Sequence, residues 1–311
     1  MSEATFFTDH WREIEDERIA RYEQMFVWRD AQLALLEGAD LKVGQRVLDI
    51  GCGPGFFAIG LAGQVGPQGR VDGVDINVRF VEDANGRAVT LDNVNFHHVN
   101  DHRLPFPDAT FDRVIMKNVL EYVPNLAGTL AEVFRVTKPG GLAHVIDSDW
   151  GFVLVEPWGK ARTDAFFLAA SPAFKEPFIG RKAAGALRSA GFESARVRMS
   201  VAPDQLGNGL NVLTNMSGYI RTFDTMPAAE VTAMLDEARA SVPDGRFLFC
   251  LPQFLVTAEK GDCGKRRLLK ERLNEHDNKR QGNRHPARRT GQGRGADWRG
   301  RTRSFCGYLA P

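Results

Sequence analysis

The segment VLDIGCGPGFF, residues 47–57, constrains the fold of this chain more than any other stretch. Three glycines at alternate positions follow an apolar run that ends in an acid, and glycine is favoured where the backbone takes a positive φ or a ligand approaches closely. Val47, Leu48 and Ile50 indicate a buried strand, and FFAIGLA indicates the helix that follows it. The glycines therefore predict a tight turn between a strand and a helix.

Composition places the chain among ordinary globular proteins. Its 311 residues are 43% hydrophobic and 25% charged, enough for one large domain or two ordinary ones. The N-terminal segment lacks the pattern of a signal peptide, and no apolar run reaches the roughly 18 residues of a membrane-spanning helix, so we expect a cytoplasmic protein without a membrane span. The cysteines, which predict neither a metal site nor a disulfide framework, are Cys52, Cys250, Cys263 and Cys306.

Helices and strands are predicted to alternate through the first 260 residues. Strands are expected at 45–50, 70–76, 94–99, 112–118, 142–149, 195–201 and 247–259. Helices are expected at 8–25, 31–39, 56–65, 78–89 and 126–137. This alternation predicts an α/β fold with a doubly wound, mostly parallel seven-stranded sheet, which binds its ligands at the carboxyl ends of the strands.

Two classes of nucleotide cofactor could explain a glycine-rich turn at that edge. A dinucleotide-binding turn has the pattern Gly-x-Gly-x-x-Gly, but its sixth position here is Phe56. Asp75, near the end of the second strand, can accept from the ribose hydroxyls of an adenosine in either class. Asp49 discriminates between them, because just before the turn it would repel a diphosphate but attract a cationic amino group.

Five short segments are typical of one enzyme family. They are VLDIGCGPG at 47–55, GVDIN at 73–77, LPFPDATFD at 104–112, VLEYV at 119–123 and KPGG at 138–141. Through them the chain resembles the class I S-adenosylmethionine-dependent methyltransferases of the small-molecule, quinone or natural-product type. The resemblance covers residues 43–149, is weaker to Lys260 and is absent beyond it. It implies a Rossmann-like methyltransferase fold and S-adenosylmethionine as the cofactor.

The resemblance also implies which residues hold that cofactor. The three glycines of the turn would let its methionine and ribose parts approach the backbone. Asp49 would help hold the methionine ammonium, Asp75 would accept from the ribose hydroxyls, and Ile76 would lie against the adenine. The complete predicted set is Tyr22, Asp49, Gly51, Gly53, Gly55, Asp75, Ile76, Asn100, Asp101, His102, Lys117 and Asn118.

Some of these assignments keep two alternatives open. The adenine amine would be bound by Asn100 or by Asp101, since either side chain offers an oxygen acceptor. Lys117 and Asn118 should border the methionine moiety through backbone groups, although Lys117 could equally be a solvated strand-end lysine. Tyr22 is predicted as a lid residue, because an aromatic ring favours a cation such as a sulfonium.

Candidates for catalysis lie at the ends of later strands. Methyl transfer from a sulfonium depends mainly on alignment of the acceptor, so no proton-transfer residue is obligatory. Asp147 and Asp149, at the end of the 142–149 strand, are predicted to face the crevice, where either could bind or deprotonate an acceptor; the alternative is a turn or cap carboxylate. His98 is a further candidate base, whereas His144 is interpreted as a core histidine. No metal is predicted.

The segments around this core predict the acceptor. Residues 150–180 hold two tryptophans and five phenylalanines, which favours an apolar pocket. Two helices are expected within 204–243, and residues 1–40 are expected to form a helical lid. We therefore predict helical cap insertions at 150–180 and 204–243 in a domain spanning 41–260, and methyl transfer to O, N or C of a small apolar or aromatic metabolite. The lid or cap could also support a homo-oligomer.

The last residues differ in composition from the rest. Residues 261–311 contain 14 Lys and Arg against 5 Asp and Glu and show little apolar periodicity, which predicts a basic tail that is disordered or non-native. A nucleic-acid-associated methyltransferase is the alternative that such a tail raises. The body lacks a basic groove and interleaved aromatic platforms for bases, so the sequence argues against nucleic acid as a partner. A cofactor-binding protein of this fold without methyl transfer is a further alternative.

Overall fold

The computed structural model describes residues 6–12, 14, 19, 26–100 and 103–262. The chain divides into two compact units, Met1–Asp262 and Cys263–Pro311, and the fold described below is that of the first. The second unit, which contains the predicted basic tail, lies outside the described residues. So do three of the predicted cofactor residues, Tyr22, Asp101 and His102.

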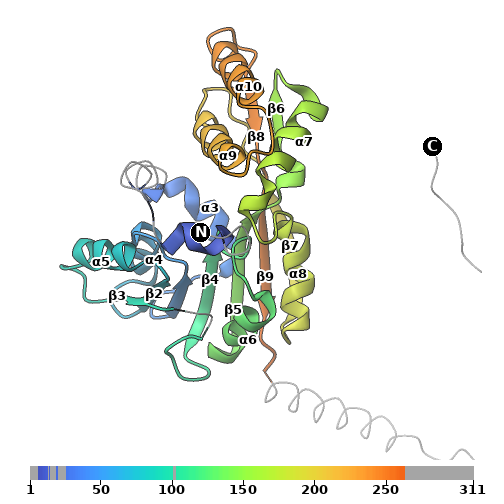
Figure 1. Cartoon of the computed structure of the whole chain (residues 1–311). Helices are drawn as coiled ribbons and strands as arrows, with labels where there is room; N and C mark the ends of the chain where they lie inside the picture. Colours follow the sequence, from blue (N-terminus) through green and yellow to red (C-terminus); the bar gives the residue numbers. More distant parts are fainter. Residues whose placement is uncertain (1–5, 13, 15–18, 20–25, 101–102, 263–311) are drawn as a thin grey trace, which may run out of the picture. The chain divides into compact units, whose positions relative to one another are not determined.

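A seven-stranded sheet forms the centre of the first unit. Its strands are β1 (Arg46–Ile50), β2 (Arg70–Asp75), β3 (Val94–His98), β4 (Phe111–Lys117), β5 (Thr137–Ser148), β7 (Glu193–Ser200) and β9 (Gln253–Glu259). Across the sheet they follow the order β3-β2-β1-β4-β5-β9-β7 (Figure 1). The first five strands pair in parallel, whereas β9 runs antiparallel to both of its neighbours. The predicted mostly parallel, seven-stranded sheet is confirmed.

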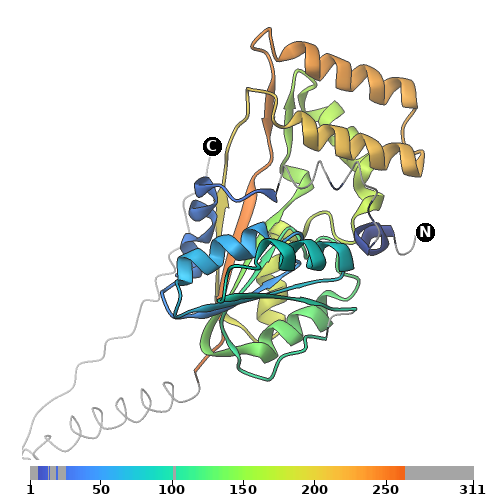
Figure 2. The same ribbon diagram turned by 90° about the vertical axis from the view of Figure 1, so that its left-hand side faces the viewer.

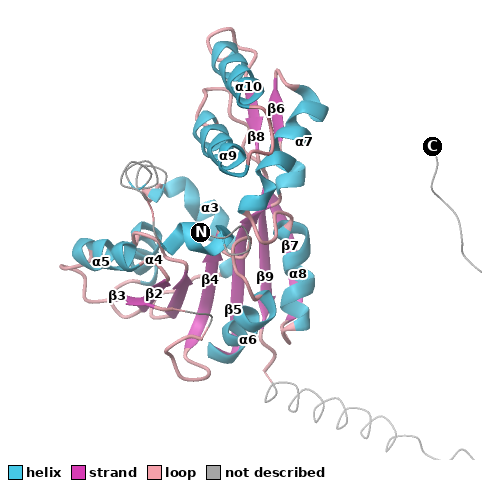
Figure 3. Ribbon diagram, in the orientation of Figure 1, coloured by secondary structure: helices cyan, strands magenta, loops and turns pink. Residues whose placement is uncertain are grey.

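Helices cover both faces of this sheet (Figure 3). One face packs against α3 (Leu33–Leu36), the 3-10 turn η2 (Glu37–Ala39), α4 (Phe56–Val65) and α5 (Val78–Arg87). The other packs against α6 (Leu126–Val136) and α8 (Ile179–Ser189). Successive residues of β4 alternate between the two cores: Ile115 joins the first, and Val114 and Met116 join the second. Both faces of β4 are therefore buried, in agreement with its largely apolar sequence FDRVIMK.

A smaller set of elements lies beyond the carboxyl ends of the parallel strands (Figures 1 and 2). We call residues 150–176 and 204–252 the cap. It contains β6 (Leu154–Glu156), α7 (Gly159–Ala170), α9 (Leu210–Phe223), α10 (Ala228–Ser241) and β8 (Leu248–Cys250), which pairs antiparallel with β6. The two helices predicted within 204–243 are α9 and α10. The predicted 247–259 strand is instead two strands in different sheets, separated by Leu251 and Pro252.

The cap has a core of its own, built by segments far apart in the sequence. Trp158, Phe166 and Phe167 are buried there with residues of α9, α10 and β8. Phe6 of α1 (Phe6–Arg12) joins the same core. The prediction that the 150–180 aromatics form a pocket wall is therefore wrong for most of them, because they fill the cap interior. No helix among the described residues has the length and apolar character needed to cross a membrane.

Candidate functional site

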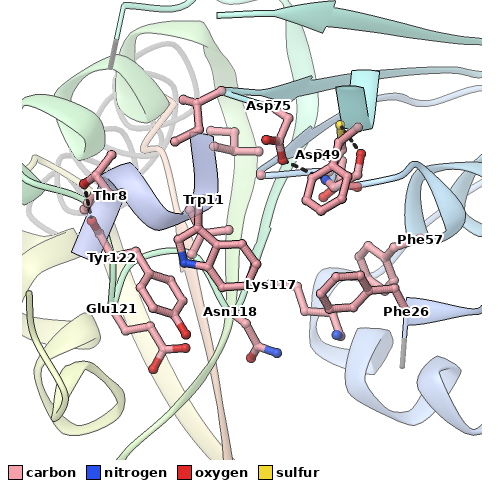
Figure 4. A pocket seen from close by; sticks show the side chains of 18 of the residues that line it. Thr8, Trp11, Phe26, Asp49, Phe57, Asp75, Lys117, Asn118, Glu121 and Tyr122 are labelled. Atoms are coloured by element: carbon pink, nitrogen blue, oxygen red, sulfur yellow. Dashed lines mark hydrogen bonds between the residues drawn. The ribbon is translucent and has the colours of Figure 1, made fainter. Parts of the chain in front are cut away.

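A cavity of about 480 Å³ opens at the carboxyl ends of β1, β2 and β4 (Figure 4). On the sheet side it is lined by the 49–54 turn, by Val74, Asp75 and Ile76 at the end of β2, and by residues 117–125 after β4. On the opposite side it is lined by α1 and by one face of α9. The cavity lies where the sequence predicts the ligand to bind, at the edge where the parallel strands end.

The three glycines of the turn all have positive φ but serve different purposes. A Cβ on Gly51 would lie 2.4 Å from a methyl carbon of Val119, and one on Gly55 would lie 2.6 Å from the Ala84 Cβ. A Cβ on Gly53 would meet no atom within 4 Å, and Gly53 lines the cavity. Gly53 is thus the position where the missing side chain leaves the backbone open to a ligand. Gly55 does not line the cavity, so close packing against Ala84 of α5 and Phe96 of β3 explains it instead.

Asp49, at the end of β1, is a buried carboxylate with unused hydrogen-bonding capacity. It is 1% exposed, it lines the cavity, and its Oδ2 has no hydrogen-bond partner. Burial raises the pKa of Asp49 to about 8, and the nearby Lys117 opposes this shift. A cationic group placed in the cavity next to Oδ2 would therefore be strongly favoured.

Asp75, at the end of β2, lies on the same cavity and is partly paired. Its Oδ2 accepts from the backbone N–H of Gly53 at 2.8 Å, and its Oδ1 accepts from the N–H of Asn77 at 2.9 Å. Burial raises the pKa of Asp75 even though these two hydrogen bonds oppose the shift. Each carboxylate oxygen keeps a further lone pair for a ligand hydroxyl. Ile76 follows directly and also lines the cavity, as predicted.

Asn100, Lys117 and Asn118 line the cavity as well. The backbone O of Asn100 accepts from Arg12 Nη2 of α1 at 2.9 Å. Burial lowers the pKa of Lys117, whose Nζ lies 5.8 Å from the centre of the Phe57 ring. Asn118 has a φ of +54°, and its buried Oδ1 has no hydrogen-bond partner. Lys117 is therefore a cavity lysine rather than a solvated strand-end residue.

Asp147 and Asp149 do not reach the cavity, so the prediction that they face the crevice is wrong. Neither residue is exposed. Asp147 accepts from the N–H groups of Leu120 (3.0 Å) and Ser148 (2.9 Å). Asp149 accepts two hydrogen bonds of 2.6 Å from Arg181 and caps the 3-10 turn η3 (Trp150–Phe152). Both carboxylates thus have structural partners, in line with the alternative reading of a turn or cap carboxylate.

His98, the candidate base, and His144, the predicted core histidine, both lie away from the cavity. His98 is exposed at the end of β3, where its Nε2 lies 3.2 Å from the carbonyl oxygen of Ile76, and it does not line the cavity. His144 is fully buried between Thr257 Oγ1 (2.7 Å) and the carbonyl of Leu35 (2.8 Å), and burial lowers its pKa to about 4. The interpretation of His144 as a core histidine is confirmed.

Glu121 is a cavity residue to which the sequence analysis gave no role. Its side chain is 2% exposed, and its Oε2 accepts from the indole Nε1 of Trp150 at 2.7 Å. The Tyr122 hydroxyl also donates to it, and Figure 4 shows that hydroxyl pointing toward the carboxylate. Burial and the neighbouring Asp147 carboxyl raise the pKa of Glu121 well above its ordinary value. The VLEYV segment contained it, but no local pattern indicates that its side chain turns inward.

Helix α1 and the cap complete the cavity on the side opposite the turn. Thr8 Oγ1 donates to the carbonyl of Tyr122 at 3.0 Å, and Asn77 Nδ2 donates to the carbonyl of Trp11 at 2.8 Å. These two bonds hold α1 across the cavity. Tyr219 of α9 lines the same region, and its hydroxyl lies 3.3 Å from the buried His10 Nε2. Within the described residues, no group of three or more His, Cys, Asp or Glu could hold a metal ion.

The chain matches known proteins over part of its length. A sequence profile described as "Methyltransferase domain" matches residues 41–172. The demethylmenaquinone methyltransferase of Geobacillus kaustophilus is 38% identical over 123 residues, which are 39% of this chain and 51% of that protein. An uncharacterized 37.1 kDa protein in transposon TN4556 of Streptomyces fradiae is 35% identical over 128 residues, 41% of this chain and 37% of that protein. The chain thus spans about half the length, or less, of these relatives.

Solved structures share the fold at low sequence identity. Phosphoethanolamine N-methyltransferase 2 of Haemonchus contortus, in complex with phosphomonomethylethanolamine and S-adenosylhomocysteine, has a TM-score of 0.57 at 18% identity and covers 84% of this chain and 61% of that one. The YcgJ protein of Bacillus subtilis has a TM-score of 0.51 at 22% identity and covers 75% of this chain and 100% of that one. At these identities the likeness concerns the fold alone.

Proposed function

We propose that this chain is a class I S-adenosylmethionine-dependent methyltransferase, that the cavity binds S-adenosylmethionine and that its methyl group is transferred to a small acceptor. The match of residues 41–172 to a methyltransferase-domain profile and the 38% identity to a demethylmenaquinone methyltransferase over 123 residues support this proposal. The acceptor is an apolar or aromatic metabolite, methylated on oxygen, nitrogen or carbon in a biosynthetic pathway for small molecules. Relatives named demethylmenaquinone methyltransferases support an acceptor of this size and character.

One observation carries the cofactor assignment. Asp49, with its unpartnered oxygen, and Asp75 line the same cavity as the open position at Gly53, whose N–H donates to Asp75. Asp49 would hold the methionine ammonium, which supplies the cation that its buried carboxylate lacks. Asp75 would accept from the ribose hydroxyls, and Ile76 and Asn100 would lie beside the adenine. Lys117 would face the methionine carboxylate, and the negative charge of that carboxylate would favour the ionised form of the Lys117 amine.

Bound S-adenosylmethionine supplies an electrophilic methyl group on a sulfonium sulfur. The protein's contribution is alignment and exclusion of water, which can lower a barrier by roughly 7–11 kcal/mol in favourable cases. Helix α1 lies across the cavity through the Thr8 and Asn77 hydrogen bonds, so it can hold an acceptor in line with the methyl group. Asp147 and Asp149 take no part in this proposal, because neither lines the cavity.

The experiment that tests this function uses label transfer. The purified full-length chain is incubated with S-adenosylmethionine labelled on its methyl group and a lipophilic extract of the source cells. We expect label in small organic molecules, and a strong decrease with Asp75→Ala, which removes a cavity carboxylate. The matched control is Glu82→Ala on α5, an exposed acid that does not line the cavity. Label in nucleic acid or protein alone would refute the small-molecule assignment.

A further inference from the structure

The part of the cavity away from the glycine turn is acidic and aromatic. We call it the acceptor region: it is formed by Trp11, Glu121, Tyr122, Trp150 and the cavity face of α9. Glu121 is the one Asp, Glu, Lys or Arg among these residues. Arg12, which follows Trp11 on α1, also lines the cavity, and its Nη2 donates to the carbonyl of Asn100 at 2.9 Å. Lys117 belongs to the other part, where its ammonium lies over the Phe57 ring. Among the described residues, the acceptor region therefore offers a carboxyl group that has no ion-pair partner.

The Glu121 carboxyl group is fixed in place by neutral donors rather than by a cation. Trp150 Nε1 and the Tyr122 hydroxyl both donate to it, so its orientation is set by two neutral donors. The Asp147 carboxyl lies near enough to disfavour its charge, and Glu121 is 2% exposed, so water does not compensate. A buried carboxylate in this position is stabilised most by a cationic ligand that donates hydrogen bonds.

Aromatic rings surround the same position. The Trp11 and Tyr122 ring centres are 5.1 Å apart at 70°, and Tyr122 lies 5.4 Å from Phe174. Figure 4 shows the Trp11 and Tyr122 rings above the Glu121 carboxylate. Aromatic faces attract a cation within about 6 Å of the ring centre, and aromatic cages are a general means of recognising substituted ammonium groups.

The number of hydrogen-bond acceptors available in the cavity favours a ligand ammonium over a ligand hydroxyl. Asn118 Oδ1 is buried without a hydrogen-bond partner and belongs to the same cavity as Glu121. A hydroxyl has one hydrogen to donate, so it could satisfy Glu121 or Asn118 but not both. A primary ammonium has three and could satisfy both. An anionic acceptor would be repelled by Glu121.

We propose that the acceptor is a small aromatic or apolar amine, bound as its ammonium by Glu121 and Asn118 and held against the Trp11 and Tyr122 rings. This inference rests on the proposed methyltransferase function and specifies the methylated atom as nitrogen. Before transfer the ammonium gives one proton to Glu121, and the nitrogen lone pair becomes available. That pair forms the new bond to the methyl carbon, while the electron pair of the broken carbon–sulfur bond stays on sulfur.

Three probes that share one aromatic frame test this inference on the full-length chain. They are phenethylamine, phenethyl alcohol and phenylacetate, titrated calorimetrically in the presence of S-adenosylhomocysteine. We expect the amine to bind at least about tenfold more tightly than the alcohol, because charge-assisted hydrogen bonds are about twice as strong as neutral ones. Phenylacetate should bind most weakly. Equal or tighter binding of phenethyl alcohol, or of 4-ethylphenol as a phenolic probe, would overturn the inference.

A substitution of Glu121 tests whether this residue causes the preference for the amine over the alcohol. Glu121→Gln should lower the affinity for phenethylamine about tenfold and leave that for phenethyl alcohol unchanged. Glu230→Gln, an exposed acid on α10 outside the cavity, should change neither. An unchanged amine preference in Glu121→Gln would contradict the role of this residue. If that variant does not fold, the ranking of probes on the unmodified chain decides alone.

The same titrations separate this inference from the function on which it rests. S-adenosylhomocysteine is titrated first, without any probe. Failure to bind it would contradict the proposed cofactor and with it the acceptor assignment. Binding of S-adenosylhomocysteine together with a ranking that does not favour the amine would overturn the amine acceptor and leave the methyltransferase function standing.

Discussion

Asp49 and Asp75 end neighbouring parallel strands, but their surroundings differ. Asp75 is held by two backbone N–H groups, whereas one oxygen of Asp49 has no partner. Both could be predicted from the sequence, because an acid directly after a buried strand must lie at the ligand-binding edge of a parallel sheet. Asp147 satisfies the same rule and still points elsewhere. Its direction depends on the Leu120 N–H, which a distant loop supplies.

The raised pKa of Asp49 predicts how stability depends on pH. Its pKa is about 8 in the folded chain against an ordinary 3.8, so between these values the folded state holds a proton that the unfolded state has lost. The free energy of unfolding should therefore fall as pH rises through this window. Asp49→Asn removes this contribution, and its unfolding free energy, measured by urea titration without ligand from about pH 5 to about pH 8, should fall less steeply.

The control for this prediction is Asp92→Asn, an exposed acid before β3. It should reproduce the pH dependence of the unmodified chain. If Asp49→Asn also kept that slope, the raised pKa of Asp49 would be refuted.

Gly53 and Gly51 should respond differently to substitution by alanine. Both have positive φ, a conformation that costs an alanine about 1–2 kcal/mol. Gly53→Ala adds a Cβ into open cavity, so we expect only that loss in unfolding free energy, together with a decrease in S-adenosylmethionine affinity on the order of tenfold. Gly51→Ala also places its Cβ 2.4 Å from Val119 and should lose more stability.

Gly63→Ala provides the matched control, because its Cβ would also meet no atom within 4 Å but its φ is not in the left-handed region. Urea unfolding and calorimetric titration measure both quantities. Unchanged S-adenosylmethionine affinity in Gly53→Ala would mean that no ligand approaches the backbone there.

At the scale of elements, the parallel strands were predictable and the cap was only partly so. α9 and α10 were found from their apolar periodicity. The break between β8 and β9 was missed, although Pro252 within an apolar run is a signal against one continuous strand. The role of the 150–180 aromatics could not be read from the sequence, because an aromatic run is compatible with a pocket wall and with a core. The contact between α7 and α9 in the folded chain shows that these aromatic residues form a core.

Phe166 provides a test of the cap core. It is fully buried against Trp158 and Phe167, so Phe166→Ala should lower the free energy of unfolding by about 3–5 kcal/mol. Leu168→Ala, two residues along the same helix and 69% exposed, should change it by less than about 0.5 kcal/mol. Urea unfolding of both variants measures the difference. Similar effects of the two substitutions would contradict the assignment of Phe166 to the core.

At the scale of the whole chain, the family match covers the glycine turn and also Glu121, Tyr122 and Trp150, but neither α1 nor α9. The family match ends at residue 172, whereas α9 lies at Leu210–Phe223. The cofactor half could therefore be predicted through the resemblance. The acceptor half could not be predicted in this way, because the cap segments, α1 and Glu121 come together only in the folded chain.

The extent of the folded unit gives a further prediction. The first compact unit ends at Asp262, and Lys260 Nζ donates to the carbonyls of Phe134 (2.6 Å) and Thr137 (2.8 Å). A chain ending at Asp262 should therefore keep the Tm and the S-adenosylmethionine affinity of the full chain. Differential scanning calorimetry and titration check this. A large fall in Tm would show that residues 263–311 take part in folding, and a salt-sensitive loss of nucleic-acid binding would give them a function.

Calorimetric titration of the full chain with S-adenosylmethionine, and separately with NADH, tests the central claim most directly. We predict saturable one-to-one binding of S-adenosylmethionine and none of NADH. Asp75→Ala should weaken S-adenosylmethionine binding by about 1.5–3 kcal/mol, as expected for loss of a hydrogen bond to a charged group. Tight binding of NADH with no response to S-adenosylmethionine would contradict the account.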